Sequence, residues 1–431
     1  MKTRECDVLV VGAGPAGIVA ACCAAGCGRA VLLVDENPAC GGQIWRAGQG
    51  AAWQPGAAPR AARKWLRRLG SSGVEILASA AAFDVDPGER LVRFEREFEP
   101  LEVRYRSLIL TTGARELWLP FPGWTRPGII GAGGIQALVK GGFPVAGRHV
   151  VVAGSGPLLL AAAALLRRHG ATVVGILEQT PWEKFSRFPL GLWKYPEKLL
   201  EAAGLILARA GVPVRTGWWL VGAGSDTADD PGRLEWVEAS NGDKVAKIWC
   251  DLVAYGYGLR PNIELAQLAG CRVSGGAVEV DEWQRSSIDG VLAAGEITGI
   301  GGAELSLTEG CIAGYAAADQ PRRARAHFAA RARQRRFAAD LERAFALRGE
   351  LKNAVTAETI VCRCEDVAAG RLGEYGSWKE AKMATRCGMG ACQGRTCGPA
   401  AEFLYGWHAE SVRPPVVPVR VGTLAGEPDP D

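Results

Sequence analysis

Histidine and methionine are scarce in this sequence, and neither sign of charge dominates it. The 431 residues include four histidines and three methionines, and 50 Lys and Arg nearly balance 46 Asp and Glu, for a net charge of +4. So small a charge does not predict a nucleic-acid-binding surface. The histidines lie outside the glycine-rich and cysteine-rich motifs described below, so the sequence indicates no acid–base catalyst.

Long apolar segments are also missing. The run at residues 150–166 has 17 uncharged residues, which is short of the roughly 20 that cross a bilayer, and Gly, Ser and Pro interrupt it. A signal peptide is a poor interpretation of residues 1–28, because Glu5 and Asp7 interrupt the basic start and glycines interrupt the apolar part. We therefore expect no transmembrane segment and a cytoplasmic protein, in which clustered cysteines serve as metal ligands or redox groups.

Glycine and cysteine, in contrast, are abundant. Glycine accounts for 57 residues and cysteine for 13, and five of the cysteines fall within residues 362–397. The glycine excess predicts several places where the backbone approaches another group closely. Hydrophobic residues make up 48% of the chain, as in an ordinary globular protein, and the length predicts two or three domains.

The N-terminal segment has the pattern of a dinucleotide-binding βαβ unit. A strand at residues 8–11 leads into a Gly-x-Gly-x-x-Gly loop, a helix of small residues follows at 18–25, and a second strand at 30–34 ends in an acid. The glycines allow a tight turn and close approach to a pyrophosphate, while the acid binds a ribose. The predicted site residues are Gly12, Gly14, Pro15, Ala16, Gly17, Asp35 and Glu36.

Three later motifs favour FAD over NAD, because they resemble the accessory motifs of glutathione-reductase-like and thioredoxin-reductase-like flavoproteins. They lie at residues 41–44, 111–115 and 291–296, and the last ends in Glu where the superfamily usually has Asp. The stretch 304–318 predicts a helix whose positive N-terminus faces the flavin. The resemblance adds to the predicted FAD site Gly42, Gln43, Ile44, Thr112, Gly113, Arg115, Gly295 and Glu296.

A second βαβ unit repeats the first at residues 149–178. Its predicted nucleotide-binding residues are Gly154, Gly156, Pro157 and Glu178. Leu159 stands where the third glycine belongs, and this side chain is expected to push the helix from the strand and alter the pocket. A nicotinamide site, a structural adenine nucleotide and an empty fold all stay open as interpretations.

Residues 321–354 form an Arg/Ala-rich linker with apolar residues at helical spacing. The pattern predicts an amphipathic helix whose basic face meets solvent. The alternative is docking to a partner or a peripheral position at an anionic membrane surface.

The clustered cysteines predict a metal centre. The predicted ligands are Cys362, Cys364, Cys392 and Cys397, with the spacing Cys-x-Cys, 27 residues, Cys-x4-Cys. Four thiolates on two glycine-rich loops suit a [2Fe–2S] cluster, because backbone N–H groups point at the sulfurs. Zinc is the alternative, although its structural sites more often have cysteines two to four residues apart in both pairs.

Together these motifs resemble the FAD-dependent subunits of heteromeric amine and amino-acid dehydrogenases, with a fused [2Fe–2S] domain of the bacterioferritin-associated ferredoxin type. The group includes the α subunits of proline, opine and D-hydroxyproline dehydrogenases and the B subunit of hydrogen cyanide synthase. The resemblance covers nearly the whole chain and includes residues 112–116, 126–128, 256–262 and 301–304. The family pattern around the second cysteine pair leaves Cys387 as a spare thiol.

The resemblance implies an electron-transfer role. In this family a flavin-containing catalytic β subunit oxidises the C–N bond, and this chain would relay the electrons through FAD and [2Fe–2S], with FMN at the subunit boundary. A small ferredoxin-like subunit is the third expected partner. The alternatives are a self-sufficient NADH-dependent reductase and a non-catalytic scaffold subunit. Disulfide reduction is not expected, because Cys22, Cys27 and Cys40 offer no pair beside the flavin.

The predicted fold class is α/β, with two Rossmann-like nucleotide-binding domains of the glutathione-reductase type and a small α-helical and loop [2Fe–2S] domain. The FAD-binding domain comprises residues 1–115 and 281–320, and the second domain comprises residues 116–280. The linker helix covers residues 321–354, and the [2Fe–2S] domain with the C-terminal tail covers residues 355–431.

Overall fold

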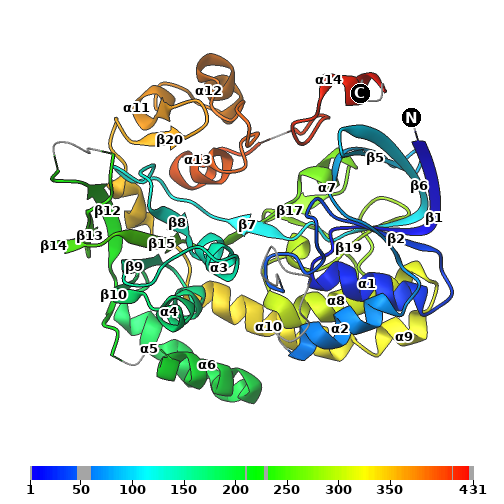
Figure 1. The fold of residues 1–431 in the computed structure, drawn as a ribbon, viewed down its shortest axis with the longest axis horizontal. Helices are drawn as coiled ribbons and strands as arrows, with labels where there is room; N and C mark the ends of the chain where they lie inside the picture. The colour runs from blue at the N-terminus through cyan, green and yellow to red at the C-terminus, as the bar shows by residue number, and fades with distance from the viewer. Residues whose placement is uncertain (1, 46–59, 209–210, 228–231, 410, 427–431) are drawn as a thin grey trace. The chain divides into compact units, whose positions relative to one another are not determined.

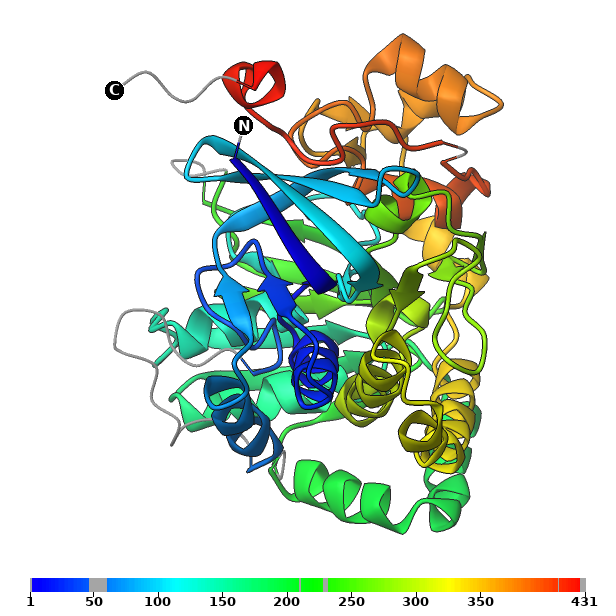
Figure 2. The same cartoon turned by 90° about the vertical axis from the view of Figure 1, so that its right-hand side faces the viewer.

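The computed structural model describes residues 2–45, 60–208, 211–227, 232–409 and 411–426 (Figure 1; Figure 2). The chain forms two compact units. The first comprises residues 1–115, 260–338 and 410–431, and the second comprises residues 116–259 and 339–409. The chain passes between them on the paired strands β7 (Ala114–Glu116) and β16 (Leu259–Pro261), and within helix α10 (Phe328–Ala344).

A seven-stranded sheet forms the centre of the first unit. Five strands run parallel in the order β3, β2, β1, β6 and β19, and β5 and β4 extend the sheet antiparallel from β6. Residues 8–11, 31–34, 108–110 and 291–293 of the parallel strands are buried on both faces, which explains why these stretches are continuous apolar runs. The strands are β1 (Lys2–Val11), β2 (Val31–Val34), β3 (Glu75–Leu77), β4 (Ala80–Asp86), β5 (Leu91–Arg96), β6 (Glu99–Leu110) and β19 (Val291–Ala293).

Helices α1 (Pro15–Ala25) and α8 (Gly302–Ala317) pack against each other on one face of this sheet (Figure 1). Their backbones approach so closely that a Cβ on Gly310 would lie 2.4 Å from the carbonyl oxygen of Ala16, and one on Gly314 would lie 2.3 Å from that of Ala20. The small residues of both helices permit this contact. The other elements of the unit are α2 (Arg60–Gly70), α7 (Glu264–Leu268), β17 (Val273–Ser274), β18 (Ala277–Val278), η2 (Glu296–Thr298), α9 (Pro321–Arg325) and α14 (Val421–Ala425).

The second unit has a parallel five-stranded sheet in the order β11, β10, β9, β15, β8, and an antiparallel sheet of β12, β13 and β14. Leu159, in place of the third glycine, is buried in the core between the sheet and its helices, so it packs as a core residue. The elements are β8 (Ile129–Gly131), α3 (Ala132–Lys140), β9 (His149–Gly154), α4 (Leu158–Arg168), β10 (Thr172–Glu178), α5 (Trp182–Gly191), η1 (Leu192–Lys194), α6 (Pro196–Ala208), β11 (Val214–Thr216), β12 (Trp219–Gly224), β13 (Trp236–Ser240), β14 (Val245–Trp249) and β15 (Leu252–Gly256).

The cysteine-rich segment belongs to the second unit and has a small hydrophobic core of its own, in which Trp378, Leu372 and Val367 are buried. The indole nitrogen of Trp124 joins this segment to the rest of the unit by donating to the carbonyl oxygen of Ile360 at 2.6 Å. The elements are η3 (Gly349–Ala354), β20 (Ile360–Cys362), β21 (Val367–Ala368), α11 (Ala369–Leu372), α12 (Trp378–Thr385) and α13 (Cys397–Tyr405).

The compact units differ from the predicted domains at three places. The chain returns to the first unit at residue 260 rather than 281, because residues 260–280 contribute β16, α7 and the β17–β18 hairpin there. Residues 410–431 also belong to the first unit rather than to the cysteine-rich region. The predicted linker helix is divided into α9, α10 and η3, so one continuous helix over residues 321–354 was wrong. Within the described residues, no helix is both long enough and apolar enough to cross a membrane.

We predict that Gly314→Ala lowers the free energy of unfolding by about 1–3 kcal/mol, because the added methyl group has no space between α1 and α8. Gly204→Ala is the matched control: Gly204 lies exposed within α6 with nothing within 4 Å of its Cβ position. Removing glycine from an exposed helix interior stabilises it by up to about 1 kcal/mol. Urea denaturation followed by circular dichroism measures both changes, and equal midpoints for the two variants would contradict the packing argument.

Candidate functional site

The predicted FAD motifs converge on the first phosphate loop. The backbone N–H of Gly41 donates to the carbonyl oxygen of Ala13 at 2.8 Å, and a Cβ on Gly42 would lie 3.0 Å from Cα of Gly14. From the other side, a Cβ on Gly295 would lie 2.8 Å from Cβ of Ala16. The structure therefore brings three segments that are far apart in sequence to one loop.

The middle motif is held by a segment 150 residues away in the chain. Thr112 and Asn262 exchange hydrogen bonds, with the hydroxyl donating at 2.6 Å and the amide at 2.9 Å. Arg115 donates to Asn262 at 2.8 Å and forms an ion pair with Glu264 at 2.6 Å. Arg115 is thereby fixed by a polar network in the first unit.

The acid of the fingerprint lies beside the loop. Asp35 is buried, and its carboxylate accepts the backbone N–H of Ala13 and that of Asn37, the latter at 2.8 Å. Glu36 is exposed, as are Gln43 and Ile44. Asp35 thus holds the loop through hydrogen bonds to its backbone, and Glu36, Gln43 and Ile44 remain at the surface.

Glu296 has a carboxylate oxygen that the described protein groups leave without a partner. One oxygen accepts the backbone N–H of Gly302 at 2.7 Å at the start of α8, whereas Oε2 is buried and unpaired among the described residues. Burial raises the pKa of Glu296, and the N–H groups of Gly302 and Gly301 oppose that shift. A buried oxygen with no donor fits a site in which a bound group supplies one. Open space over Gly14, where a Cβ would meet nothing within 4 Å, fits the phosphates of the same group.

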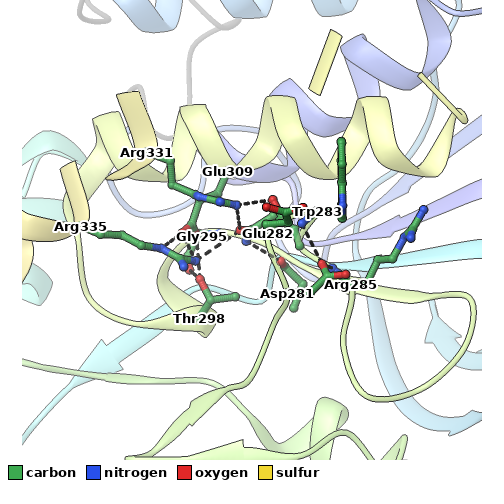
Figure 3. Close-up of polar contacts among 11 residues, drawn as sticks. Asp281, Glu282, Trp283, Arg285, Gly295, Thr298, Glu309, Arg331 and Arg335 are labelled. Atoms are coloured by element: carbon green, nitrogen blue, oxygen red, sulfur yellow. Dashed lines mark hydrogen bonds and ion pairs between the residues drawn. The ribbon is translucent and has the colours of Figure 1, made fainter. Parts of the chain in front are cut away.

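A buried carboxylate that the sequence did not single out supports the third FAD motif (Figure 3). Glu309 on α8 has a side chain only 1% exposed and accepts hydrogen bonds from the backbone N–H of Gly295 at 3.0 Å and from the hydroxyl of Thr298 at 2.7 Å. Arg335 on α10 donates to it at 2.9 and 2.7 Å. The buried charge of Glu309 is thus paired with Arg335, and its hydrogen bonds hold the loop from Gly295 to Thr298 in place.

Gln284 extends this network. It is fully buried, has the left-handed φ of +65°, donates to the carbonyl oxygen of Ala293 in β19 and accepts from Arg331 at 3.1 Å and Arg335 at 3.2 Å. The predicted solvated basic face of α10 is therefore wrong at Arg331, which is buried, whereas Arg335 is paired with Glu309 and remains 39% exposed. The signal in the sequence was the spacing of four between these two arginines, which places both on one face of a helix.

A cavity of about 420 Å³ in the second unit brings the four predicted metal ligands together. The structure thus joins two cysteine pairs from loops that are separated in sequence. The donor set of four thiols fits a [2Fe–2S] cluster. The lining residues are Cys362, Cys364, Cys392, Cys397, Arg363, Thr396, Trp118 and Trp124.

Cys387 lies against this group but does not line the cavity. The sulfur atoms of Cys362, Cys387 and Cys397 lie within 4.8 Å of one another, so proximity alone favours Cys387 as a ligand. The cavity favours Cys364 and Cys392 instead, since Cys387 is not among the described residues that line it and is fully buried. A cluster needs space between its ligands, and Cys364 and Cys392 border that space.

Hydrogen bonds favour the thiolate form of two predicted ligands. Contact with the thiols of Cys387 and Cys397 lowers the pKa of Cys362, and contact with Cys397 together with the N–H groups of Thr396 and Gly394 lowers that of Cys392. The same contacts with Cys362, Cys387 and Cys392 raise the pKa of Cys397. Thiolates are the metal-binding form of cysteine.

Two tryptophans that sequence reasoning missed form the wall of the cavity. Trp118 lies 5.7 Å from Trp124 and 5.5 Å from Tyr255 between ring centroids. No spacing in the sequence links them to the cysteines. Apolar rings exclude water from one side of the cavity, and such exclusion affects the potential of a bound cluster.

The arginines that flank the cysteines have different surroundings. Arg363 is exposed at the cavity, whereas Arg386 forms an ion pair with Glu365 at 2.8 Å and so contributes little net charge. Arg395 donates to the carbonyl oxygen of Cys392 at 3.4 Å.

The second set of predicted nucleotide-binding residues also lies together, at the ends of β9 and β10. Gly154 is required there, because a Cβ would lie 1.7 Å from the carbonyl oxygen of Gly256. The carboxylate of Glu178, however, is only 3% exposed and accepts the backbone N–H of Gly156 at 2.7 Å. The groups that would meet a nucleotide are bonded within the protein.

Comparison with known proteins agrees with this geometry. The chain belongs to the pyridine nucleotide-disulphide oxidoreductase family, whose model matches residues 6–331. It is 32% identical to hydrogen cyanide synthase subunit HcnB of Pseudomonas aeruginosa over 90% of each chain, and 32% identical to an opine oxidase subunit of Rhizobium meliloti over 97% of this chain and 98% of that protein. The predicted family is confirmed, and the chain is an oxidoreductase. Its membership of this family supports FAD as the cofactor.

Solved structures confirm the predicted fold class. L-proline dehydrogenase from P. horikoshii aligns with 98% of this chain and 80% of its own, with a TM-score of 0.69 and 21% identity. T. acidophilum thioredoxin reductase aligns with 73% of this chain and 98% of its own, with a TM-score of 0.56 and 19% identity. The nucleotide-binding domains thus have the fold of the family, and the cysteine-rich segment follows them.

We predict that Cys387→Ala retains iron and acid-labile sulfide near the wild-type ratio, whereas Cys392→Ala loses most of both. The reason is that Cys392 lines the cavity and Cys387 lies behind it. Iron and sulfide assays on the purified variants measure the effect. The reverse result would assign the fourth ligand to Cys387.

We also predict that Arg335→Ala weakens FAD binding about tenfold, which corresponds to about 1.4 kcal/mol, because the Gly295 loop loses its support. Arg336→Ala is the control, since Arg336 is exposed on the same helix. Fluorescence titration of the apoprotein with FAD gives the dissociation constants. Equal affinities in the two variants would remove Glu309 and Arg335 from any role at the flavin.

Proposed function

We propose that this chain is the FAD- and [2Fe–2S]-containing electron-transfer subunit of a heteromeric dehydrogenase that oxidises the C–N bond of an amino acid or amine. The observation that carries the proposal is the cavity lined by four cysteines in a chain of the pyridine nucleotide-disulphide oxidoreductase family. Both relatives named above are themselves described as subunits, which supports the existence of partners.

The first unit holds FAD in this proposal. The N–H groups at the start of α1 bind the pyrophosphate, Asp35 and Glu36 bind the ribose, and Gly14 gives the phosphates close access. Glu296 accepts a hydrogen bond from a hydroxyl of the ribityl chain through its unpaired Oε2. The remaining residues of the proposed site are Gly12, Pro15, Ala16, Gly17, Gly42, Gln43, Ile44, Thr112, Gly113, Arg115 and Gly295.

The second unit holds the cluster through Cys362, Cys364, Cys392 and Cys397. When bound, flavin accepts electrons in pairs and a [2Fe–2S] cluster carries them singly, so the two groups together convert pair transfer into single-electron flow. The exposed side chain of Cys364 leaves that edge of the site accessible to solvent or to a partner. Electron transfer to a small ferredoxin-like subunit is consistent with this exposure.

A separate β subunit carries out the oxidation in this proposal. Within the described residues, no histidine lies at the flavin motifs. The β subunit supplies its own flavin and the substrate site, and FMN at the boundary passes electrons to this chain.

Co-purification with the products of neighbouring genes, followed by anaerobic titration with glycine, proline, hydroxyprolines and opines, tests the proposal. One of these amines is expected to bleach the flavin and then generate the electron paramagnetic resonance signal of a reduced [2Fe–2S] cluster. If no amine reduces flavin or cluster in the assembled complex, the proposal fails.

A further inference from the structure

The second phosphate loop, residues 154–157, is covered by residues 345–348 of the same unit, which follow α10. The hydroxyl of Ser155 donates to the carbonyl oxygen of Phe345 at 3.0 Å, and a Cβ on Gly156 would lie 3.9 Å from Cγ of the Phe345 ring. In a dinucleotide-binding fold this surface receives the pyrophosphate. The segment therefore occupies the place of a ligand.

Gln179, which is fully buried at the end of β10, holds this segment through its amide group. The nitrogen donates to the carbonyl oxygen of Ala346 at 3.2 Å and to the hydroxyl of Ser155 at 3.0 Å. The oxygen accepts the backbone N–H of Arg348 at 3.3 Å. One side chain thus satisfies backbone groups on both sides of the turn at residue 347, which would otherwise need water.

Aromatic contacts anchor both ends of the segment. The Phe345 ring lies edge-on to Phe188, with 5.2 Å between centroids, and at 6.4 Å from Phe185, both on α5. At the other end, the Arg348 guanidinium lies 4.8 Å above the Trp219 ring. These contacts stabilise the segment against displacement.

Glu178 faces the protein interior. One oxygen accepts the N–H of Gly156 and the other accepts the N–H of Thr180 at 2.9 Å, and burial raises the pKa of this carboxyl against those hydrogen bonds. A phosphate at this loop would require the N–H of Gly156, and Glu178 already accepts it.

The first phosphate loop shows the opposite arrangement. A Cβ on Gly14 would meet nothing within 4 Å, whereas the equivalent Gly156 has Phe345 above it. The two loops share a sequence pattern and a strand–loop–helix framework. What differs is the chain segment that lies over the second loop.

We infer that residues 345–348 are the permanent ligand of the second Rossmann fold, and that they exclude pyridine and adenine nucleotides from it. Electrons for this chain then come from a donor that does not use the second site. Within the proposed function, the electron donor is then not a pyridine nucleotide. The coverage of the second phosphate loop rests on contacts within this chain and does not depend on the cofactors or on a partner subunit.

The first test is titration of the purified full-length protein with NADH and with ADP-ribose. Calorimetry and NADH fluorescence are expected to show no saturable binding, and NADH is expected to leave the flavin oxidised under anaerobic conditions. Saturable binding of either nucleotide, or bleaching by NADH, would overturn the inference. Amine-dependent reduction in the assembled complex is a separate measurement, so the proposed function can fail while this inference stands.

The second test is hydrogen–deuterium exchange of the peptide that contains residues 345–348. Gln179→Ala removes the amide clamp and is expected to speed exchange of the Arg348 N–H at least tenfold. Gln136→Ala is the control, because the Gln136 side chain donates within α3 to the carbonyl oxygen of Ala132. If the two variants exchange alike in this peptide, the segment is not held on the loop as described.

Discussion

Close backbone contact at the first phosphate loop is the constraint on which the rest of the first unit depends. A Cβ on Gly17 would lie 1.8 Å from the carbonyl oxygen of Gly12, and one on Gly310 of α8 would lie 2.4 Å from the carbonyl oxygen of Ala16 in α1. With no side chains between them, strand, loop and both helices form one compact framework. The three flavin motifs can contact the loop because no side chains separate the surrounding backbone segments from it.

The two βαβ repeats show how the same local sequence pattern supports different sites. In the first, Glu309 and Arg335 hold the Gly295 loop, which contacts the phosphate loop at Ala16, and the space over Gly14 stays open. In the second, Glu178 and Gln179 bind protein groups on the ligand side. The distinction lies in which residues from distant parts of the chain supply the hydrogen-bond partners.

The cysteine-rich segment also depends on close packing around glycine. Its small core around Trp378 positions the two cysteine loops, and Trp124 fixes one of them through the Ile360 carbonyl. Gly388 has a φ of +81° and would clash with Trp378 if it had a Cβ, at 2.6 Å. The cavity therefore depends on glycine conformations as much as on the cysteines, which accounts for part of the high glycine content.

The sequence by itself determined the βαβ units, the glycine loops and the grouping of four cysteines, because these follow from short-range periodicity and spacing. It did not predict the broken linker helix. It also did not predict the burial of Arg331, which bonds to Glu282 and Gln284 in another segment. The state of the second loop was left open by the sequence. Tertiary structure decided it by placing Phe345 over Gly156, because hydrogen bonds and packing between residues nearly 190 positions apart have no signature in local sequence.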